Sequence, residues 1–260
     1  MDQFKKNSPW LFFQYSIIKV TNKIINKINQ INKGDLFGYE IFELSSSEAI
    51  AGYKVLSRLS GKGIIKRAKK GYYYKPIFSA FGEQKPKENL LLDLYLFKKE
   101  EQVAYVTGIR LYNRLGLIPD TPSFIHIASL DKQIKGKIGS VTLKPSKSYV
   151  QVSSNAIKYL ELLDVIKDLN IIPGLQKKEA LGYLKKEFHN FTTVEIKNLI
   201  NYGLSYPPKV RALLGALLEE IQIDSQLYTD LRKSIKSSSN SFQCGINKEL
   251  LSTANSWKIA

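Results

Sequence analysis

The stretch from Ser45 to Pro76, SSSEAIAGYKVLSRLSGKGIIKRAKKGYYYKP, restricts the possible folds of this chain more than any other part. It predicts a helix, a tight basic turn and a two-stranded ribbon. Ser45 to Ser47 offer side-chain oxygens that can cap a helix N-terminus, and an amphipathic segment runs from Glu48 to Ser60. At 100° per residue, one stripe of this helix carries Glu48, Ala49, Gly52, Val55, Leu56 and Leu59. The opposite face carries Ser46, Ser47, Ile50, Tyr53, Lys54 and Ser57, with Arg58 at its flank.

The residues after the helix predict a hairpin. Gly61 and Gly63 end the helix, the β-branched pair Ile64 and Ile65 begins a strand, and Gly71 turns the chain into Tyr72–Tyr74. No acidic residue lies between Glu48 and Glu83, whereas eight basic residues do: Lys54, Arg58, Lys62, Lys66, Arg67, Lys69, Lys70 and Lys75.

A helix followed by a basic hairpin is the outline of a winged helix-turn-helix, whose helix enters a DNA groove while the hairpin lies along phosphates. Basic runs are also common on solvated surfaces, and a helix–hairpin unit can be scaffold alone. Charge, helix polarity and hairpin together favour DNA binding. The predicted contacts are Ser46, Ser47, Tyr53, Lys54, Ser57, Arg58, Lys62, Lys66, Arg67, Lys69, Lys70 and Tyr72.

The same stretch carries a family resemblance. LSRLSGKGIIKRAKKGYYYKP (Leu56–Pro76) resembles the winged-helix segment of the AbiEi-type antitoxins, which are transcriptional regulators of type IV toxin–antitoxin and abortive-infection systems. The similarity continues in YVTGIRLYNRLGLIPDTP (Tyr105–Pro122), in YPPKVRALLGALLEE (Tyr206–Glu220) and in an end that contains Trp257. These blocks keep the family's order and cover most of the chain from about residue 20.

Charge is concentrated near the N-terminus. The chain has 260 residues and a net charge of +16, and residues 1–80 hold 14 basic against 5 acidic side chains. That distribution favours a polyanion-binding end over a uniformly basic protein. Cys244 is the only cysteine, and the apolar cluster PWLFFQYSII is too short and interrupted to span a membrane. We therefore expect a cytoplasmic protein without a membrane partner.

Two domains are predicted, 1–80 and 81–260, with residues 1–15 as an extension. Helical spacing predicts a first helix from Ser16 to Ile31, whose Lys19, Lys23 and Lys27 form a basic row that either faces solvent or touches a DNA backbone. A short second helix or turn follows at 35–44, and Phe78 to Pro86 reads as a linker. The second domain is expected to mix strands and helices up to about residue 150 and to be helical from Ala156 onward.

Residues that could carry catalysis are scarce. His126 and His189 are isolated, His126 lies within an apolar strand as a core residue, and Cys244 has no activating base nearby in sequence. A Gly-Ser pair, Gly139–Ser140, also occurs in nucleotidyltransferases, whose chemistry needs paired carboxylates shortly afterwards to hold Mg²⁺. Here the next acidic residue is Glu161 and no paired Asp follows, so the match fails. The block Tyr105–Pro122 is interpreted as structural, with Tyr112, Asn113 and Arg114 facing solvent, and a contact surface is the alternative. We expect no catalytic residues, no metal site and no cofactor.

The predicted fold class is α+β: an N-terminal winged helix-turn-helix, then a mixed α/β region and a helical C-terminal portion. The resemblance implies an antitoxin of a type IV toxin–antitoxin system that represses its own promoter and opposes a nucleotidyltransferase toxin, without implying a direct complex with it. The alternative is a winged-helix regulator with a ligand-sensing or dimerising C-terminal domain and no toxin partner. An enzyme acting on nucleic acid is disfavoured by the lack of paired acids.

Overall fold

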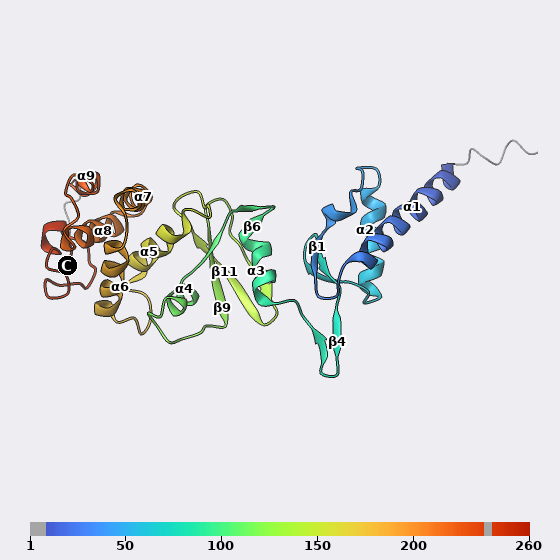
Figure 1. Ribbon diagram of the computed structural model, residues 1–260, viewed down its shortest axis with the longest axis horizontal. Helices are drawn as coiled ribbons and strands as arrows, with labels where there is room; N and C mark the ends of the chain where they lie inside the picture. The colour runs from blue at the N-terminus through green and yellow to red at the C-terminus, as the bar shows by residue number, and fades with distance from the viewer. Residues whose placement is uncertain (1–8, 237–240) are drawn as a thin grey trace, which may run out of the picture. The chain divides into compact units, whose positions relative to one another are not determined.

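The computed structural model describes residues 9–236 and 241–260 and is an α+β fold (Figure 1). The chain divides into two compact units, Met1–Leu94 (unit 1) and Tyr95–Ala260 (unit 2). This boundary lies inside helix α3 (Glu88–Leu96), later than the predicted boundary at residue 80. Among the described residues, no helix is long and apolar enough to cross a membrane.

Unit 1 begins with helix α1 (Pro9–Gln30), so the predicted helix start at Ser16 is wrong by about two turns. Of the predicted 1–15 extension, residues 1–8 lie outside the described part of the chain and the remainder is helical. The next elements are strand β1 (Leu36–Gly38), the 3-10 turn η1 (Tyr39–Phe42) and helix α2 (Ala49–Gly61). Strands β2 (Lys66–Lys69) and β3 (Tyr72–Tyr74) complete a three-stranded antiparallel sheet of order β1-β3-β2.

The core of unit 1 is formed by apolar residues at helical spacing on α1 and α2 packed against the sheet. The buried members are Val20, Ile24, Ile28, Phe37, Phe42, Val55, Leu56, Leu59, Ile65 and Tyr73. The predicted linker at 78–86 is wrong in its first part, because Ile77–Ser79 (β4) and Gly82–Gln84 (β5) pair as an antiparallel hairpin. Gly82, at a φ of 103°, supplies the turn conformation that this hairpin needs.

Unit 2 contains a four-stranded sheet of order β10-β11-β9-β8. Strands β9 and β11 are parallel, whereas the other pairs are antiparallel. The strands are β8 (Tyr105–Thr107), β9 (Phe124–Ser129), β10 (Gly136–Ile138) and β11 (Val141–Lys147). A small hairpin, β6 (Phe97–Lys98) with β7 (Glu101–Gln102), precedes them, and helix α4 (Ile109–Arg114) follows β8.

The remainder of unit 2 is helical, as predicted from residue 156 onward. The helices are α5 (Ile157–Asp168), α6 (Lys177–His189), α7 (Thr193–Gly203), α8 (Pro208–Glu220), α9 (Thr229–Ile235) and the 3-10 turn η2 (Asn255–Trp257). A capping box formed by Thr192 and Glu195 begins α7. Helix α8 is buried from Ala212 to Leu218, and a Cβ on Gly215 would lie 2.1 Å from the Trp257 ring, so only glycine allows this packing.

Candidate functional site

Helix α2 has the two faces that its sequence predicts. Gly52, Val55, Leu56 and Leu59 are buried against unit 1, which fixes the rotation of the helix. The opposite face is exposed and consists of Ile50, Tyr53, Lys54, Ser57 and Arg58. Ile50 is 71% exposed and Tyr53 is 55% exposed, so apolar surface lies between the polar side chains of this face.

The start of α2 differs from the prediction. The N-cap residue is Glu48, and no side-chain oxygen of Ser45, Ser46 or Ser47 caps the helix. Instead, one carboxylate oxygen of Glu48 accepts hydrogen bonds from the backbone N–H and the hydroxyl of Ser45, both at 3.0 Å. Those bonds lower the pKa of Glu48 and hold the serine turn against the helix end. Ser46 and Ser47 are exposed and precede the helix, so they are not on its outer face.

The segment from Lys62 to Lys70 that follows α2, called the basic turn below, presents basic side chains to solvent. Lys62, Arg67 and Lys70 are exposed, and Gly63 and Gly71 have φ values of 70° and 84°. Strand β2 begins at Lys66 rather than at the predicted Ile64. The reason is that the N–H groups of Gly63 and Ile64 donate to the Ser60 and Leu59 carbonyls, a C-terminal cap that ends the helix and holds Ile64 outside the strand. Ile65 is then buried in the core while Ile64 remains 47% exposed.

Three of the basic residues are already engaged within unit 1. Lys66 forms an ion pair with Glu83, whose pKa is lowered by that hydrogen bond and by the hydroxyl of Tyr74. Lys69 donates to the Leu94 carbonyl at 2.7 Å, and Lys75 donates to two carbonyls at the end of α1. Lys66 and Lys69 therefore offer less charge to a ligand than the sequence predicts. The remaining predicted contact, Tyr72, is partly buried.

The lysine row on α1 is exposed as well. Lys19, Lys23 and Lys27 all face solvent, and Lys23 Nζ donates to the Glu43 carbonyl at 2.6 Å.

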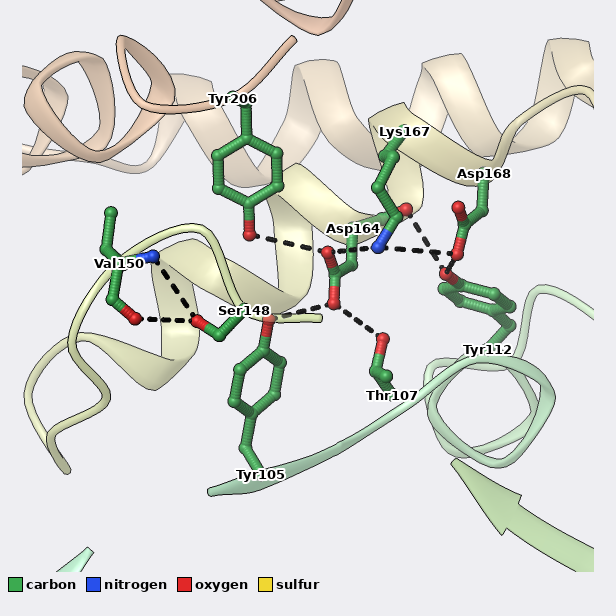
Figure 2. A network of polar contacts seen from close by, with 9 residues as sticks. All are labelled: Tyr105, Thr107, Tyr112, Ser148, Val150, Asp164, Lys167, Asp168 and Tyr206. Atoms are coloured by element: carbon green, nitrogen blue, oxygen red, sulfur yellow. Dashed lines mark hydrogen bonds and ion pairs between the residues drawn. The ribbon is translucent and has the colours of Figure 1, made fainter. Parts of the chain in front are cut away.

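Unit 2 contains a polar cluster that the sequence did not predict (Figure 2). Its centre is Asp164 on α5, whose side chain is fully buried. Asp164 Oδ2 accepts from Thr107 Oγ1 at 2.6 Å and from the Tyr105 hydroxyl at 2.9 Å. Asp164 Oδ1 accepts from Lys167 Nζ at 2.7 Å and from the Tyr206 hydroxyl at 3.3 Å.

Asp168 extends the cluster by one helical turn. The Tyr112 hydroxyl donates to Asp168 Oδ2 at 2.6 Å, and Lys167 Nζ lies 3.8 Å from the same oxygen. Burial raises the pKa of Asp168 and raises the pKa of Tyr112 well above its ordinary value. Burial alone would lower the pKa of Lys167, but the Asp164 and Asp168 carboxylates outweigh it and raise that pKa. Lys167 is therefore a charged ammonium held between two carboxylates.

Two sequence interpretations in this region are wrong. The sequence suggests that Tyr112 faces solvent, but Tyr112 is buried because its ring packs in the core while its hydroxyl reaches Asp168. The sequence predicts His126 in the core, but His126 is only partly buried, because it lines an open pocket on its face of strand β9. Asp164 could have been found, since it lies four residues after Leu160 on the apolar stripe of its helix.

The two remaining residues that the sequence singled out, Cys244 and His189, differ in burial. Cys244 is buried and its pKa is raised by burial, while His189 is exposed. Among the residues that the structure describes, no three His, Cys, Asp or Glu side chains are grouped as metal ligands.

The fold thus defines an α+β protein with a basic helix–hairpin unit and a second unit built on a mixed sheet and helices. No protein-family model matches the chain, and no curated protein matches it. Among solved structures, the RV2827C protein of Mycobacterium tuberculosis is similar, with a TM-score of 0.47 and 10% sequence identity. The match covers 86% of this chain and 84% of that chain.

Proposed function

We propose that unit 1 is a winged helix-turn-helix that binds duplex DNA, with α2 as the helix that enters the major groove. The order of elements supports this proposal: a helix, a strand, a short helical turn, a second helix and then a two-stranded ribbon. Strand β1 pairs with β3 of the ribbon, giving the order β1-β3-β2. The turn between β2 and β3 would lie along the phosphate backbone as the wing.

One observation carries the proposal, namely the exposed cationic surface that runs from the outer face of α2 into the basic turn. Its members are Lys54, Arg58, Lys62, Arg67 and Lys70, all exposed. No acidic residue interrupts the sequence between Glu48 and Glu83, so the segment that carries this surface holds only positive charge. Cationic side chains that displace counterions from phosphates supply most of the sequence-independent affinity for DNA.

We propose further that the protein is an antitoxin of a type IV toxin–antitoxin system and a repressor of its own promoter. The four sequence blocks that resemble AbiEi-type antitoxins support this function. In such a system the nucleotidyltransferase activity belongs to the toxin, which agrees with the lack of paired acids after Gly139–Ser140 in this sequence. The role in phage defence follows from the same resemblance, and a direct complex with the toxin is not part of the proposal.

A second candidate is a winged-helix regulator whose unit 2 senses a small ligand and which has no toxin partner. The specific observation that favours it is a pocket with apolar walls and several polar groups beside the cluster of Figure 2. Growth assays separate the two candidates: an antitoxin rescues cells that express the nucleotidyltransferase encoded beside its gene, whereas a ligand-sensing regulator does not.

DNA binding is tested by titrating the full-length protein with duplex DNA from its own promoter at several salt concentrations. The logarithm of the affinity should fall linearly with the logarithm of the salt concentration, by about 0.9 per phosphate neutralised. The triple variant Lys62→Ala, Arg67→Ala, Lys70→Ala should bind every sequence more weakly and with a flatter slope. Lys178→Ala, an exposed lysine of unit 2, is the control and should change neither value. Unchanged affinity in the folded triple variant would remove the basic turn from the interface.

A further inference from the structure

A pocket of about 290 Å³ lies beside the buried polar cluster, wholly within unit 2. Its residues come from β8, α4, β9, β11, the end of α5 and the loop that follows. The lining consists of Thr107, Gly108, Ile109, Tyr112, His126, Pro145, Ser146, Lys167, Asp168 and 171–173. This volume is at the low end of the range for small-molecule sites, so the pocket would enclose one small ring system.

Strand register explains why polar groups of the sheet meet at this pocket. Thr107 pairs with His126, and in the neighbouring row Ala128 pairs with Ser146. Paired residues of adjacent strands share a face, and residues two apart on one strand do also. Thr107, His126 and Ser146 therefore lie on one face of the sheet, the face whose Tyr105 and Thr107 hydroxyls reach Asp164 on α5.

The floor of the pocket has an unused hydrogen-bond acceptor. Asp168 Oδ2 is occupied by Tyr112 and Lys167, whereas its other oxygen, Oδ1, receives no hydrogen bond from any residue that the structure describes (Figure 2). The Asp168 side chain is 14% exposed, so this oxygen is neither fully buried nor simply in bulk water. A ligand N–H group would satisfy it, and an anionic ligand would be repelled by the two carboxylates.

Hydrogen-bond donors lie beside that acceptor. Lys167 is a charged ammonium with 18% of its side chain exposed, and Ser146 contributes a hydroxyl. His126 is half-buried, and burial together with Lys144 and Lys167 lowers its pKa, so its ring is neutral at neutral pH and can donate or accept. An ammonium on the floor also disfavours a polyamine, because two like charges would share the same small space.

The walls of the pocket are apolar and come from rigid or branched residues. Pro145, Pro173 and Ile172 line it, and Ile171 stands at its rim with 73% of its surface exposed. Such walls bury a flat hydrocarbon or heteroaromatic body, which gains affinity from the loss of apolar surface to water.

We propose that this pocket binds an amino-substituted heterocycle of nucleobase size. The exocyclic amino group would donate to Asp168 Oδ1, and the adjacent ring nitrogen would accept from Lys167 or Ser146. The donor–acceptor edge shared by adenine and cytosine has this order of groups. The pocket uses no residue of the DNA-binding surface, so this proposal stands or falls independently of the proposed DNA binding and antitoxin function.

The test is isothermal titration calorimetry of the full-length protein with adenine, cytosine, hypoxanthine and uracil. Adenine or cytosine should bind, whereas hypoxanthine and uracil, which lack the amino group, should bind about tenfold more weakly or worse, the worth of one hydrogen bond to a charged group. Asp168→Asn should reduce the affinity for adenine and cytosine similarly. Asp168→Asn could also disturb the fold, because Asp168 accepts the Tyr112 hydroxyl. A second variant, Ile171→Trp, therefore changes only an exposed residue at the rim, where the larger side chain should close the pocket and abolish binding.

Val194→Trp is the matched control, because Val194 on α7 is 66% exposed and lies outside the pocket. It should leave binding unchanged. Absence of binding by all four bases at millimolar concentration would overturn the proposal. So would equal binding of the amino and oxo bases, or binding that Ile171→Trp does not affect. Agmatine and inorganic phosphate serve as further probes, and a preference for either over adenine and cytosine would also overturn it.

Discussion

Lys66 on strand β2 and Glu83 on strand β5 form an ion pair that joins the three-stranded sheet of unit 1 to the adjoining hairpin. Glu83 Oε1 also accepts the hydroxyl of Tyr74 at 2.8 Å, so the carboxylate is held from two sides. Lys66 has a partner within unit 1, whereas the neighbouring Arg67 is exposed. Adjacent positions on one strand therefore differ in the charge that they can offer to DNA.

The first prediction compares these two residues. Arg67→Ala should lower the affinity for duplex DNA and reduce the salt slope by about 0.9, the value for one phosphate contact. Lys66→Ala should have a smaller effect, because its charge is already compensated by Glu83. Glu83→Gln should raise the affinity, since it frees Lys66. Fluorescence anisotropy at several salt concentrations measures all three. Equal losses from Arg67→Ala and Lys66→Ala would show that the ion pair does not limit Lys66.

The second prediction concerns sequence readout. Lys54 and Ser57 lie on the exposed face of α2, so we expect them to contact base edges. Their replacement by alanine should change the preference among operator variants, by about 1–3 kcal/mol per lost base contact, more than it changes bulk DNA affinity. Competition binding with operator and scrambled duplexes measures this preference. Lys70→Ala is the control and should weaken both duplexes equally. A uniform loss from Lys54→Ala would assign it to the phosphates instead.

Much of unit 1 could be predicted from sequence because its pattern is local. Apolar residues at helical spacing placed Val55, Leu56 and Leu59 inside, and glycines marked the turns. The prediction that a serine caps α2 was wrong, because the Ser45 hydroxyl donates to the Glu48 carboxylate instead of accepting from the helix N-terminus. The engagement of Lys66 could not be predicted, since it depends on a partner 17 residues away on a hairpin that looked like a linker.

The cluster of unit 2 was missed for a related reason. Asp164 bonds to Tyr105, Thr107 and Tyr206, which are separated from it by 42 to 59 residues, and only the packing of the sheet and the later helices against α5 brings them together. The sequence contains one indication of this cluster, namely an aspartate on the apolar stripe of a helix. Buried charges are rarely tolerated without partners, so such a residue predicts a network even where its members are unknown.

The third prediction is that Asp164 stabilises unit 2. Asp164→Ala would remove the closest carboxylate from the largely buried Lys167 ammonium. It would also remove the acceptor of the Tyr105, Thr107 and Tyr206 hydroxyls. Removing one partner of a buried ion pair typically costs about 3–5 kcal/mol. Urea denaturation should show a loss of that size, while Asp230→Ala, which breaks an exposed ion pair with Lys233, should cost less than about 1 kcal/mol. A loss below that of Asp230→Ala would contradict the role of the cluster.

The fourth prediction is a pH dependence at the start of α7. Glu195 completes the capping box and pairs with Lys158, and these contacts lower its pKa from 4.5 to about 2. A carboxylate whose pKa is lowered by folding stabilises the folded state above its ordinary pKa, and this contribution is lost as the pH falls towards 2. Glu195→Gln should lower the Tm near neutral pH, and the difference from the parent should shrink over that acidic range.

Because Glu195 is solvent-accessible, the difference should also decrease at high salt. Glu249→Gln, which removes an exposed negative charge outside any helix, is the control for net charge. A difference between Glu195→Gln and the parent that stays constant down to the lowest pH would show that the charge of Glu195 is not responsible.

The fifth prediction is that the two proposed activities separate. The division falls inside α3, and unit 2 has its own continuous core, so a fragment from Lys87 to Ala260 keeps α3 whole. That fragment should fold cooperatively and bind promoter DNA poorly, because it lacks the cationic surface of α2 and the basic turn. If the protein is an antitoxin, the fragment should still rescue cells that express the cognate toxin, while residues 1–86 should repress without rescue. Circular dichroism melting checks the fold before the growth assay. A cooperatively folded fragment that gives no protection where the full-length protein does would contradict this division of roles, and would place part of the antitoxin activity in unit 1.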